Sequence, residues 1–280
     1  MKKLLALCLT AAMVLALAAC GGSTSGAGSS ASSEQAAAET EAAGETQTFV
    51  MGIDPEYPPF SYMDDDGNYT GFDVEICQAV CDHLGWEMKV FGVNWDQKLV
   101  QLDAGECDCV WSGMTIMKSM KESGYVISKP YFYNTQVLLV KEDSDITSAD
   151  DLAGKSVAVQ LGTSGEVLLQ EDLADLAATF GELVTCDSFL KCFTELDGNA
   201  VDAVFVDLPV ALSYTAEHEG FRIVNEELGA EEYGIAFRSV DQVLCDQVEG
   251  AIAELVADGT YAQIAAKYPD IVDNLIFLNE

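Results

Sequence analysis

The sequence predicts an α/β fold made of two similar lobes. Short apolar strands alternate with helical segments along most of the chain, and the succession of strand, polar turn and helix starts again near residue 150. Extended segments near residues 133 and 233 give the chain two places at which it can cross between lobes. We therefore expect one lobe over residues 48–133 and 233–280, and the other over residues 134–232.

The composition limits the classes of partner. The 280 residues include 13 Lys and Arg against 47 Asp and Glu, for a formal net charge of −34. A chain this acidic repels phosphate groups, so we exclude nucleic acid as a partner. The hydrophobic content of 49% is still enough for a packed core, so the acidic residues are expected on the solvated surface.

The first 19 residues are typical of an export signal. Lys2 and Lys3 precede an apolar run over residues 4–17, which is shorter than the roughly 20 residues of a membrane-spanning helix. Residues 17–21, Leu-Ala-Ala-Cys-Gly, resemble a bacterial lipobox, which implies cleavage before Cys20 and attachment of lipid to its sulfur. A plain signal peptide cut near the same place is the alternative. Cleavage leaves 11 basic and 47 acidic residues, a net charge of −36.

The segment over residues 20–47 is predicted to be a disordered, lipidated tether. From residue 21 onward it contains no aromatic or large aliphatic residue, so it cannot bury enough surface to order itself. The mature protein is therefore expected at the extracytoplasmic face of the bacterial cell membrane, held there by its lipid.

Nine cysteines in an exported chain raise the question of disulfides. Cys8 leaves with the signal and Cys20 is the lipid site, so an odd number remains. We expect most of these to be buried thiols that act as small apolar side chains, with the first two on one face of a helix and the next two on one face of a strand. A disulfide such as Cys186–Cys192 stays open, whereas a metal site is disfavoured because no His completes a ligand set. The seven are Cys77, Cys81, Cys107, Cys109, Cys186, Cys192 and Cys245.

The first lobe is predicted to open with a buried strand over residues 49–53. It ends at Asp54, because the prolines that follow cannot donate hydrogen bonds to a neighbouring strand. The turn brings the Asp54 carboxylate and the rings of Tyr57 and Phe60 to the carboxyl end of the strand, where ligands bind in open α/β sheets. A helix with one apolar face follows over residues 72–84.

Two further strands are expected in the first lobe, over residues 88–91 and 107–111. Between them, residues 95–104 carry leucines at helical spacing and begin with Trp95. The third strand ends in a polar turn, Ser112-Gly113-Met114-Thr115. This turn is the second candidate for a binding segment at a strand end.

The second lobe repeats this order. A strand over residues 156–160 ends at Gln160, and Gly162, Thr163 and Ser164 precede a helix. Thr163 or Ser164 is a good N-cap, and exposed amide groups at the start of a helix suit a carboxylate or phosphate. A cap that serves its helix alone is the alternative.

The rest of the second lobe and the return to the first lobe follow the same pattern. A buried strand over residues 201–206 delivers Asp207 to its carboxyl end. Because polar groups collect at strand ends in both lobes, a cleft between the lobes is the expected binding site. The other predicted strands cover residues 183–186, 221–224 and 233–237, and the other helices cover residues 189–196, 243–257 and 264–268.

A set of short motifs in a fixed order resembles the family 3 extracellular solute-binding proteins of bacterial ABC importers. The resemblance covers residues 48 to about 270 and implies the type II periplasmic-binding-protein fold, whose two lobes close on a ligand about two hinge crossings. The motifs are Asp54-x-x-Tyr57-x-Pro59-Phe60, Gly71-Phe72-Asp73, Asp108 through Ser112-Gly113-x-Thr115, Asp151-Leu152-x-Gly154-Lys155, Gly162-Thr163-Ser164, Asp202-Ala203-Val204-x-x-Asp207, Tyr233-Gly234-Ile235-Ala236 and Asp258-Gly259-Thr260-Tyr261.

The resemblance also implies a function. It indicates the lipid-anchored substrate-binding component of an importer, a monomer that delivers a small amino acid or related amine to a permease and uses no cofactor or metal. Tyr57 and Trp95 should wall the ligand side chain, with Asp54 near its polar end, although Trp95 has a core aromatic as its alternative. Asp207 should pair with the ligand ammonium. The remaining expected ligand contacts are Ser112, Gly113 and Thr115 in the first lobe and Gln160, Thr163 and Ser164 in the second.

One departure from the family pattern concerns the ligand carboxylate. The family has an arginine five residues after the threonine of the polar turn, and Met120 stands there in this chain. Lys121 takes the place of the arginine if one residue is inserted, and Lys118 is the other candidate. Both can instead be ordinary surface lysines.

An enzyme on the same fold, such as a dehydratase, is the competing function, and a tethered sensor is a further alternative. Catalysis would need a positioned acid or base in the cleft. The two histidines, His83 and His218, do not lie at strand ends, and residues 162–165 lack the spacing of a nucleophile elbow. We therefore expect a binding protein.

Overall fold

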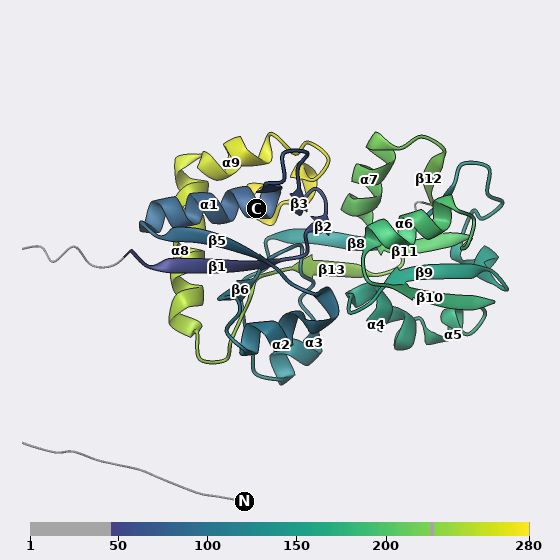
Figure 1. Ribbon diagram of the computed structural model, residues 1–280, viewed down its shortest axis with the longest axis horizontal. Helices are drawn as coiled ribbons and strands as arrows, with labels where there is room; N and C mark the ends of the chain where they lie inside the picture. Colours follow the sequence, from purple (N-terminus) through teal and green to yellow (C-terminus); the bar gives the residue numbers. More distant parts are fainter. Residues whose placement is uncertain (1–45, 225–226, 280) are drawn as a thin grey trace, which may run out of the picture. The chain divides into compact units, whose positions relative to one another are not determined.

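The computed structural model describes residues 46–224 and 227–279 (Figure 1). The predicted signal peptide, Cys20 and all but the last two residues of the predicted tether lie outside the described residues. The folded part belongs to one compact unit, Glu45–Glu280. Two separate mixed sheets, each covered by helices on both faces, form its two lobes.

The first lobe is built on a five-stranded sheet. Its central strand β1 pairs in parallel with β5 on one side and β6 on the other, and β14 runs antiparallel to β6 and β7. The strand order is β5 (Glu87–Gly92), β1 (Thr48–Ile53), β6 (Cys109–Val110), β14 (Ala236–Phe237) and β7 (Val126–Ile127). The carboxyl ends of the three parallel strands therefore meet at one edge.

In the first lobe, alternate side chains of β1 pack against helices on opposite faces of the sheet. Phe49, Met51 and Ile53 of β1 pack into the same cluster as the apolar face of α1, whereas Val50 contacts the cluster on the other face. The first face is covered by α1 (Phe72–Leu84), α8 (Gln242–Asp258) and α9 (Thr260–Ala265), the second by η1 (Trp95–Gln97), α2 (Lys98–Asp103) and α3 (Lys118–Glu122), and the chain ends in η3 (Val272–Asn274) and α10 (Ile276–Asn279).

The second lobe is built on the other large sheet. β9 is parallel to β10 and β11, while the long strand β8 runs antiparallel to β11, β12 and β13. The strand order is β10 (Glu182–Cys186), β9 (Ser156–Gln160), β11 (Ala203–Asp207), β8 (Phe132–Lys141) and β12 (Phe221–Val224), with β13 (Ala230–Tyr233) paired to the start of β8.

Helices also cover both faces of this sheet. Val204 and Val206 of β11 pack toward α6 and α7, and Ala203 and Phe205 pack toward the opposite face. The helices are α6 (Phe189–Asp197) and α7 (Leu208–Glu217) on one face, and α4 (Ser164–Gln170), α5 (Ala174–Ala177) and η2 (Ala149–Leu152) on the other.

β8 and β13 are the two crossings between the lobes. Residues 132–135 of β8 pair with β13, and residues 136–140 of the same strand pair with β11. Bridges from Phe132 to Leu275 and from Tyr233 to Thr115 connect the near ends of these strands to the first lobe. The two segments therefore form one antiparallel ladder between the lobes (Figure 1).

The cysteines differ from expectation in two ways. β6 is shorter than the predicted strand over residues 107–111, so Cys107 lies before it and packs with α2, while Cys109 packs with the α1 cluster. Strand alternation therefore does not apply to this pair, and the prediction that they share a face was wrong. All seven cysteines of the described chain are buried and free, so Cys186 and Cys192 form no disulfide.

Over residues 46–224 and 227–279, none of the helices combines the length and the apolar character that crossing a membrane requires.

Candidate functional site

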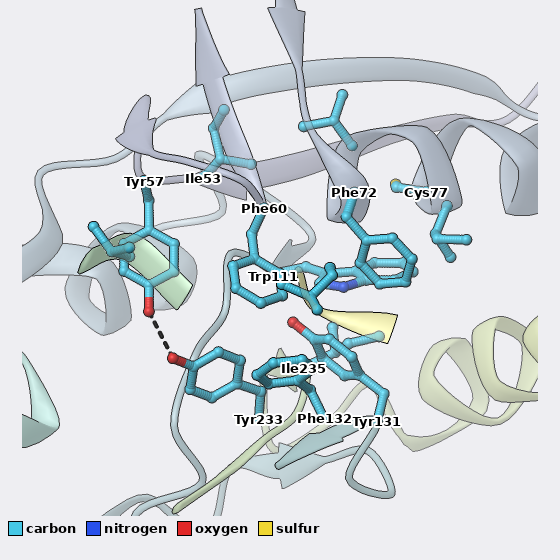
Figure 2. Packing of buried hydrophobic residues seen from close by; sticks show 14 of the residues in the cluster. Ile53, Tyr57, Phe60, Phe72, Cys77, Trp111, Tyr131, Phe132, Tyr233 and Ile235 are labelled. Carbon is cyan, nitrogen blue, oxygen red and sulfur yellow. Dashed lines mark hydrogen bonds between the residues drawn. The ribbon is translucent and has the colours of Figure 1, made fainter. Parts of the chain in front are cut away.

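The loop after β1 places Tyr57 in a cluster of packed aromatic rings. A small antiparallel sheet of β2 (Glu56–Tyr57), β3 (Ser61–Met63) and β4 (Tyr69–Thr70) holds the loop. The Phe60 ring packs edge-on against Phe132 and Tyr233, with centroids 5.1 and 5.4 Å away (Figure 2). The Tyr57 hydroxyl lies 2.7 Å from the Tyr233 hydroxyl, and the Tyr57 ring is stacked on Trp95. Tyr57 is therefore fixed by both its ring and its hydroxyl.

Asp207 lies at the end of β11 with 3% of its surface exposed. Its Oδ1 accepts hydrogen bonds from Asn134 Nδ2 at 2.6 Å, Gln136 Nε2 at 2.7 Å and the Tyr233 hydroxyl at 3.1 Å. Burial, with a smaller contribution from Glu231, raises the pKa of Asp207 to about 7. All of these hydrogen-bond donors are neutral, so the described residues give this carboxylate no cationic partner.

Glu231 adds a second carboxylate beside Asp207. It stands directly opposite Asn134 in the β8–β13 ladder. Its Oε2 accepts hydrogen bonds from Asn134 Nδ2 and the Thr115 hydroxyl, both at 2.9 Å, while its buried Oε1 has no partner. Glu231 was not predicted from the sequence, because only the pairing of the crossing strands brings this residue to Asp207.

The polar turn after β6 holds its shape through Asp73. Gly113 has a φ of 50°, and a Cβ there would lie 2.4 Å from the Tyr57 ring, so only glycine fits. The Gly113 amide donates to Asp73 Oδ2 at 2.7 Å, and the Tyr131 hydroxyl donates to the same oxygen. The Gly113 amide is thus used inside the protein and not for a ligand.

Two residues after Gly113, the backbone amide of Thr115 donates to no acceptor among the described residues. In the bridge with Tyr233 the hydrogen bonds run from Gly234 to Met114 and from Ile116 to Glu232. Thr115 is therefore in the non-hydrogen-bonded position, and its own N–H points away from β13. The Thr115 hydroxyl also lies 3.1 Å from the Ser164 hydroxyl of the other lobe.

In the turn before α4, the hydroxyl group of Thr163 makes its hydrogen bonds within its own lobe. The Thr163 hydroxyl donates to the Gln160 carbonyl at 2.7 Å and accepts from the Glu166 amide at 3.2 Å. This hydroxyl serves as the N-cap of α4, which was the alternative reading of the segment. Ser164 remains as the hydroxyl that faces the first lobe.

Lys98, at the start of α2, reaches across to the second lobe. Its Nζ donates to the Trp95 carbonyl at 3.1 Å and to the Gly162 carbonyl at 2.6 Å, and it lies 4.6 Å from the centroid of the Trp95 ring. Only 5% of its surface is exposed. Burial lowers the pKa of Lys98 to about 8. Lys98 was not predicted as a site residue, because a lysine in an amphipathic helix is normally exposed at the surface.

These groups enclose a narrow cavity between the two lobes. Seven of the residues predicted from the sequence line the cavity, namely Tyr57, Trp95, Gly113, Thr115, Thr163, Ser164 and Asp207. Four further lining residues were not predicted, namely Lys98, Met114, Met117 and Gly162. The arrangement offers an anion, a cation, two aromatic walls and several hydrogen-bond donors to a small polar molecule.

Comparison with known proteins gives this cavity a context. The model of the bacterial extracellular solute-binding proteins, family 3, matches residues 49–270. The chain belongs to this family. The L-cystine-binding protein TcyJ of Escherichia coli (strain K12) is 34% identical over 227 residues, which cover 80% of this chain and 83% of that protein. A probable histidine-binding protein of Neisseria gonorrhoeae is 30% identical over 272 residues, which cover 96% of each chain.

Solved structures agree with the fold. An ancestral arginine-binding protein, in a structure with bound arginine, matches with a TM-score of 0.73 at 34% identity, over 79% of this chain and 97% of that chain. The prediction of a two-lobed, type II solute-binding fold is therefore confirmed. The family and these relatives are binding proteins.

Three predicted ligand contacts of this solute-binding protein bond to one another and to the backbone instead. Asp54 accepts from Gln160 Nε2 at 2.7 Å through Oδ2 and from the Glu56 amide through Oδ1. The fully buried Ser112 hydroxyl accepts from the Asp54 amide at 3.0 Å. Asp54 and Gln160 thus join the lobes beside the cavity, and neither these two residues nor Ser112 lines it.

The structure does not bring Lys121 to the cavity. In α3, the side chain of Met120 is buried in the core. Lys121 is turned about 100° from Met120 around the helix, and its side chain is exposed to solvent. Lys118 is also exposed and forms an ion pair with Glu122 at 3.3 Å. The prediction that Lys121 replaces the family arginine at the cavity is therefore corrected.

Proposed function

We propose that this solute-binding protein captures a small amino acid or related amine between its lobes, with the ligand ammonium on Asp207. The observation that carries the proposal is the buried Asp207 carboxylate in the cavity lining, with a second carboxylate nearby and only neutral hydrogen-bond donors. A buried charge without a partner is costly, so a ligand cation stabilises this site. The names of the relatives, which bind cystine, histidine or arginine, support an amino acid.

The ligand carboxylate faces the opposite part of the cavity. The backbone amides of Thr115 and Thr163 are the donors proposed for it, and the Ser164 hydroxyl joins them by turning its single proton from Thr115 to the ligand. Tyr57 and Trp95 form the wall along the rest of the molecule.

Isothermal titration calorimetry with a panel of L-amino acids tests the proposal. Asp207→Asn keeps the shape of the side chain but removes its charge. Loss of one partner of a desolvated ion pair costs about 2–5 kcal/mol, so the dissociation constant should rise at least about thirtyfold. Asp65→Asn, at an exposed aspartate with no side-chain hydrogen bond or ion pair among the described residues, is the control for the change in net charge. A dissociation constant for Asp207→Asn within about threefold of wild type contradicts the ammonium assignment.

We further propose that the protein is a lipid-anchored monomer that serves an ABC permease, with lobes over residues 48–133 plus 233–280 and residues 134–232. The lipobox-like sequence around Cys20 supports the anchor. Cys20→Ala should leave the signal uncleaved or release the folded domain from the membrane fraction. A variant that stays acylated contradicts the anchor, and amino-acid uptake that survives deletion of the gene contradicts the importer role.

A further inference from the structure

We infer that Lys98 is the residue that pairs with the carboxylate of the bound amino acid. The inference rests on the proposed function, because it assigns a partner to the ligand group opposite the ammonium. The first observation behind it is the position of Lys98. Lys98 lines the cavity together with Thr115, Thr163 and Ser164, which surround the proposed carboxylate site.

The hydrogen bonds of Lys98 leave it incomplete. A lysine ammonium has three N–H donors. Two are used on the carbonyl groups of Trp95 and Gly162. The third has no acceptor among the described residues, so it remains for a group in the cavity.

The charge of Lys98 is also unbalanced. Asp54, Asp96 and Glu166 lie near enough to influence it, yet no carboxylate of the described chain comes within ion-pair distance of its Nζ. All three accept hydrogen bonds from other groups, Asp54 from Gln160, Asp96 from Gln97 and Glu166 from the Gly162 amide. A lysine that is 95% buried normally has an ion-pair partner, and here the ligand carboxylate supplies it.

The two charges of the lining match a zwitterion. Among the residues that line this cavity, Lys98 is the cation and Asp207 is the anion. Lys98 also bonds to Gly162 in the other lobe, so it holds the carboxylate at the point where the lobes meet. A single residue thereby links recognition of the carboxylate to closure.

A double-mutant cycle between the lysine and the carboxylate tests the inference. L-arginine, L-histidine and L-cystine are titrated into wild type, Lys98→Met and Lys98→Arg, together with their methyl esters, which lack the carboxylate charge. Lys98→Met should weaken binding of the free amino acid at least about tenfold but that of its ester less than about threefold. Lys98→Arg should retain more affinity than Lys98→Met.

Each other outcome has a distinct meaning. Equal losses for amino acid and ester mean that Lys98 only joins the lobes, which overturns the inference but not the proposed function. If no amino acid of the calorimetry panel binds wild type below about 1 mM, the proposed function and the inference are overturned together. Where the esters bind too weakly for the cycle, NMR of labelled lysine replaces it. The pKa of Lys98 should be higher with the amino acid bound than in the free protein, and an unchanged pKa overturns the inference.

Discussion

Buried ionisable groups at the site make the stability of the protein depend on pH. Asp73, which holds Gly113 in place, is fully buried. Burial raises the pKa of Asp73 from 3.8 to about 7. Between these values the folded protein keeps a proton that the unfolded chain releases. The free energy of unfolding therefore falls as the pH rises from about 4 to about 7 and is independent of this group above that range.

Asp73→Asn should remove this dependence. From pH 5 to pH 8, wild type should lose stability relative to the variant, by a slope on the order of 1 kcal/mol per pH unit below pH 7. Urea unfolding at the two pH values measures the difference. Asp65→Asn makes the same change in net charge at an exposed position. If both variants lose stability in parallel with wild type between the two pH values, the pKa assigned to Asp73 is contradicted.

Individual residues show where sequence reasoning succeeds and where it stops. Asp207 and Tyr57 could be placed because a motif fixes each at the end of a strand. Lys98 and Glu231 could not, because their burial depends on contacts with the other lobe or the other crossing strand. Asp54 and Gln160 lie at the expected strand ends, yet they bond to each other, and only the three-dimensional arrangement distinguishes that from a ligand contact.

At the scale of elements, local signals located α1 and most of the longer strands. They missed α7 (Leu208–Glu217), and the helix expected over residues 264–268 begins earlier, since α9 spans Thr260–Ala265. The helix predicted over residues 72–84 is α1, and Gly85 ends it in the left-handed conformation. β6 has only two residues, because the paired length of a strand depends on its neighbours and not on its own apolar run. The misplaced Cys107 follows from this difference.

The start of α4 offers a prediction about an element. The Thr163 hydroxyl caps this helix and also bonds to the Gln160 carbonyl. Thr163→Ala should lower the free energy of unfolding by about 0.5–2 kcal/mol, while Thr163→Ser keeps the hydroxyl and should cost less. Urea unfolding of the two variants measures this. Equal losses would mean that the methyl group, and not the cap, is what matters.

At the scale of the whole molecule, hydrogen bonds that involve side chains join the lobes around the cavity. Those among the described residues include bonds of Asp54 with Gln160, Lys98 with Gly162, Thr115 with Ser164 and Glu231, and Tyr233 with Asp207. A bound amino acid would add its own bonds to both sides of this contact. We expect the lobes to rotate about the ladder of β8 and β13.

Closure on a ligand is the prediction at this scale. Small-angle scattering of the mature protein should give a smaller radius of gyration with a saturating amino acid than without it. The tether contributes equally to both samples, so the difference reports the lobes. The same radius in both samples contradicts ligand-driven closure.

The central claim is that an amino acid binds between the lobes with its ammonium on Asp207. A crystal structure of the protein with the amino acid that binds most tightly tests it most directly. We predict the ligand nitrogen within hydrogen-bond distance of the Asp207 carboxylate and the ligand carboxylate near Thr115 and Ser164. A ligand bound elsewhere, or one whose nitrogen leaves Asp207 bonded only to Asn134, Gln136 and Tyr233, would contradict the claim.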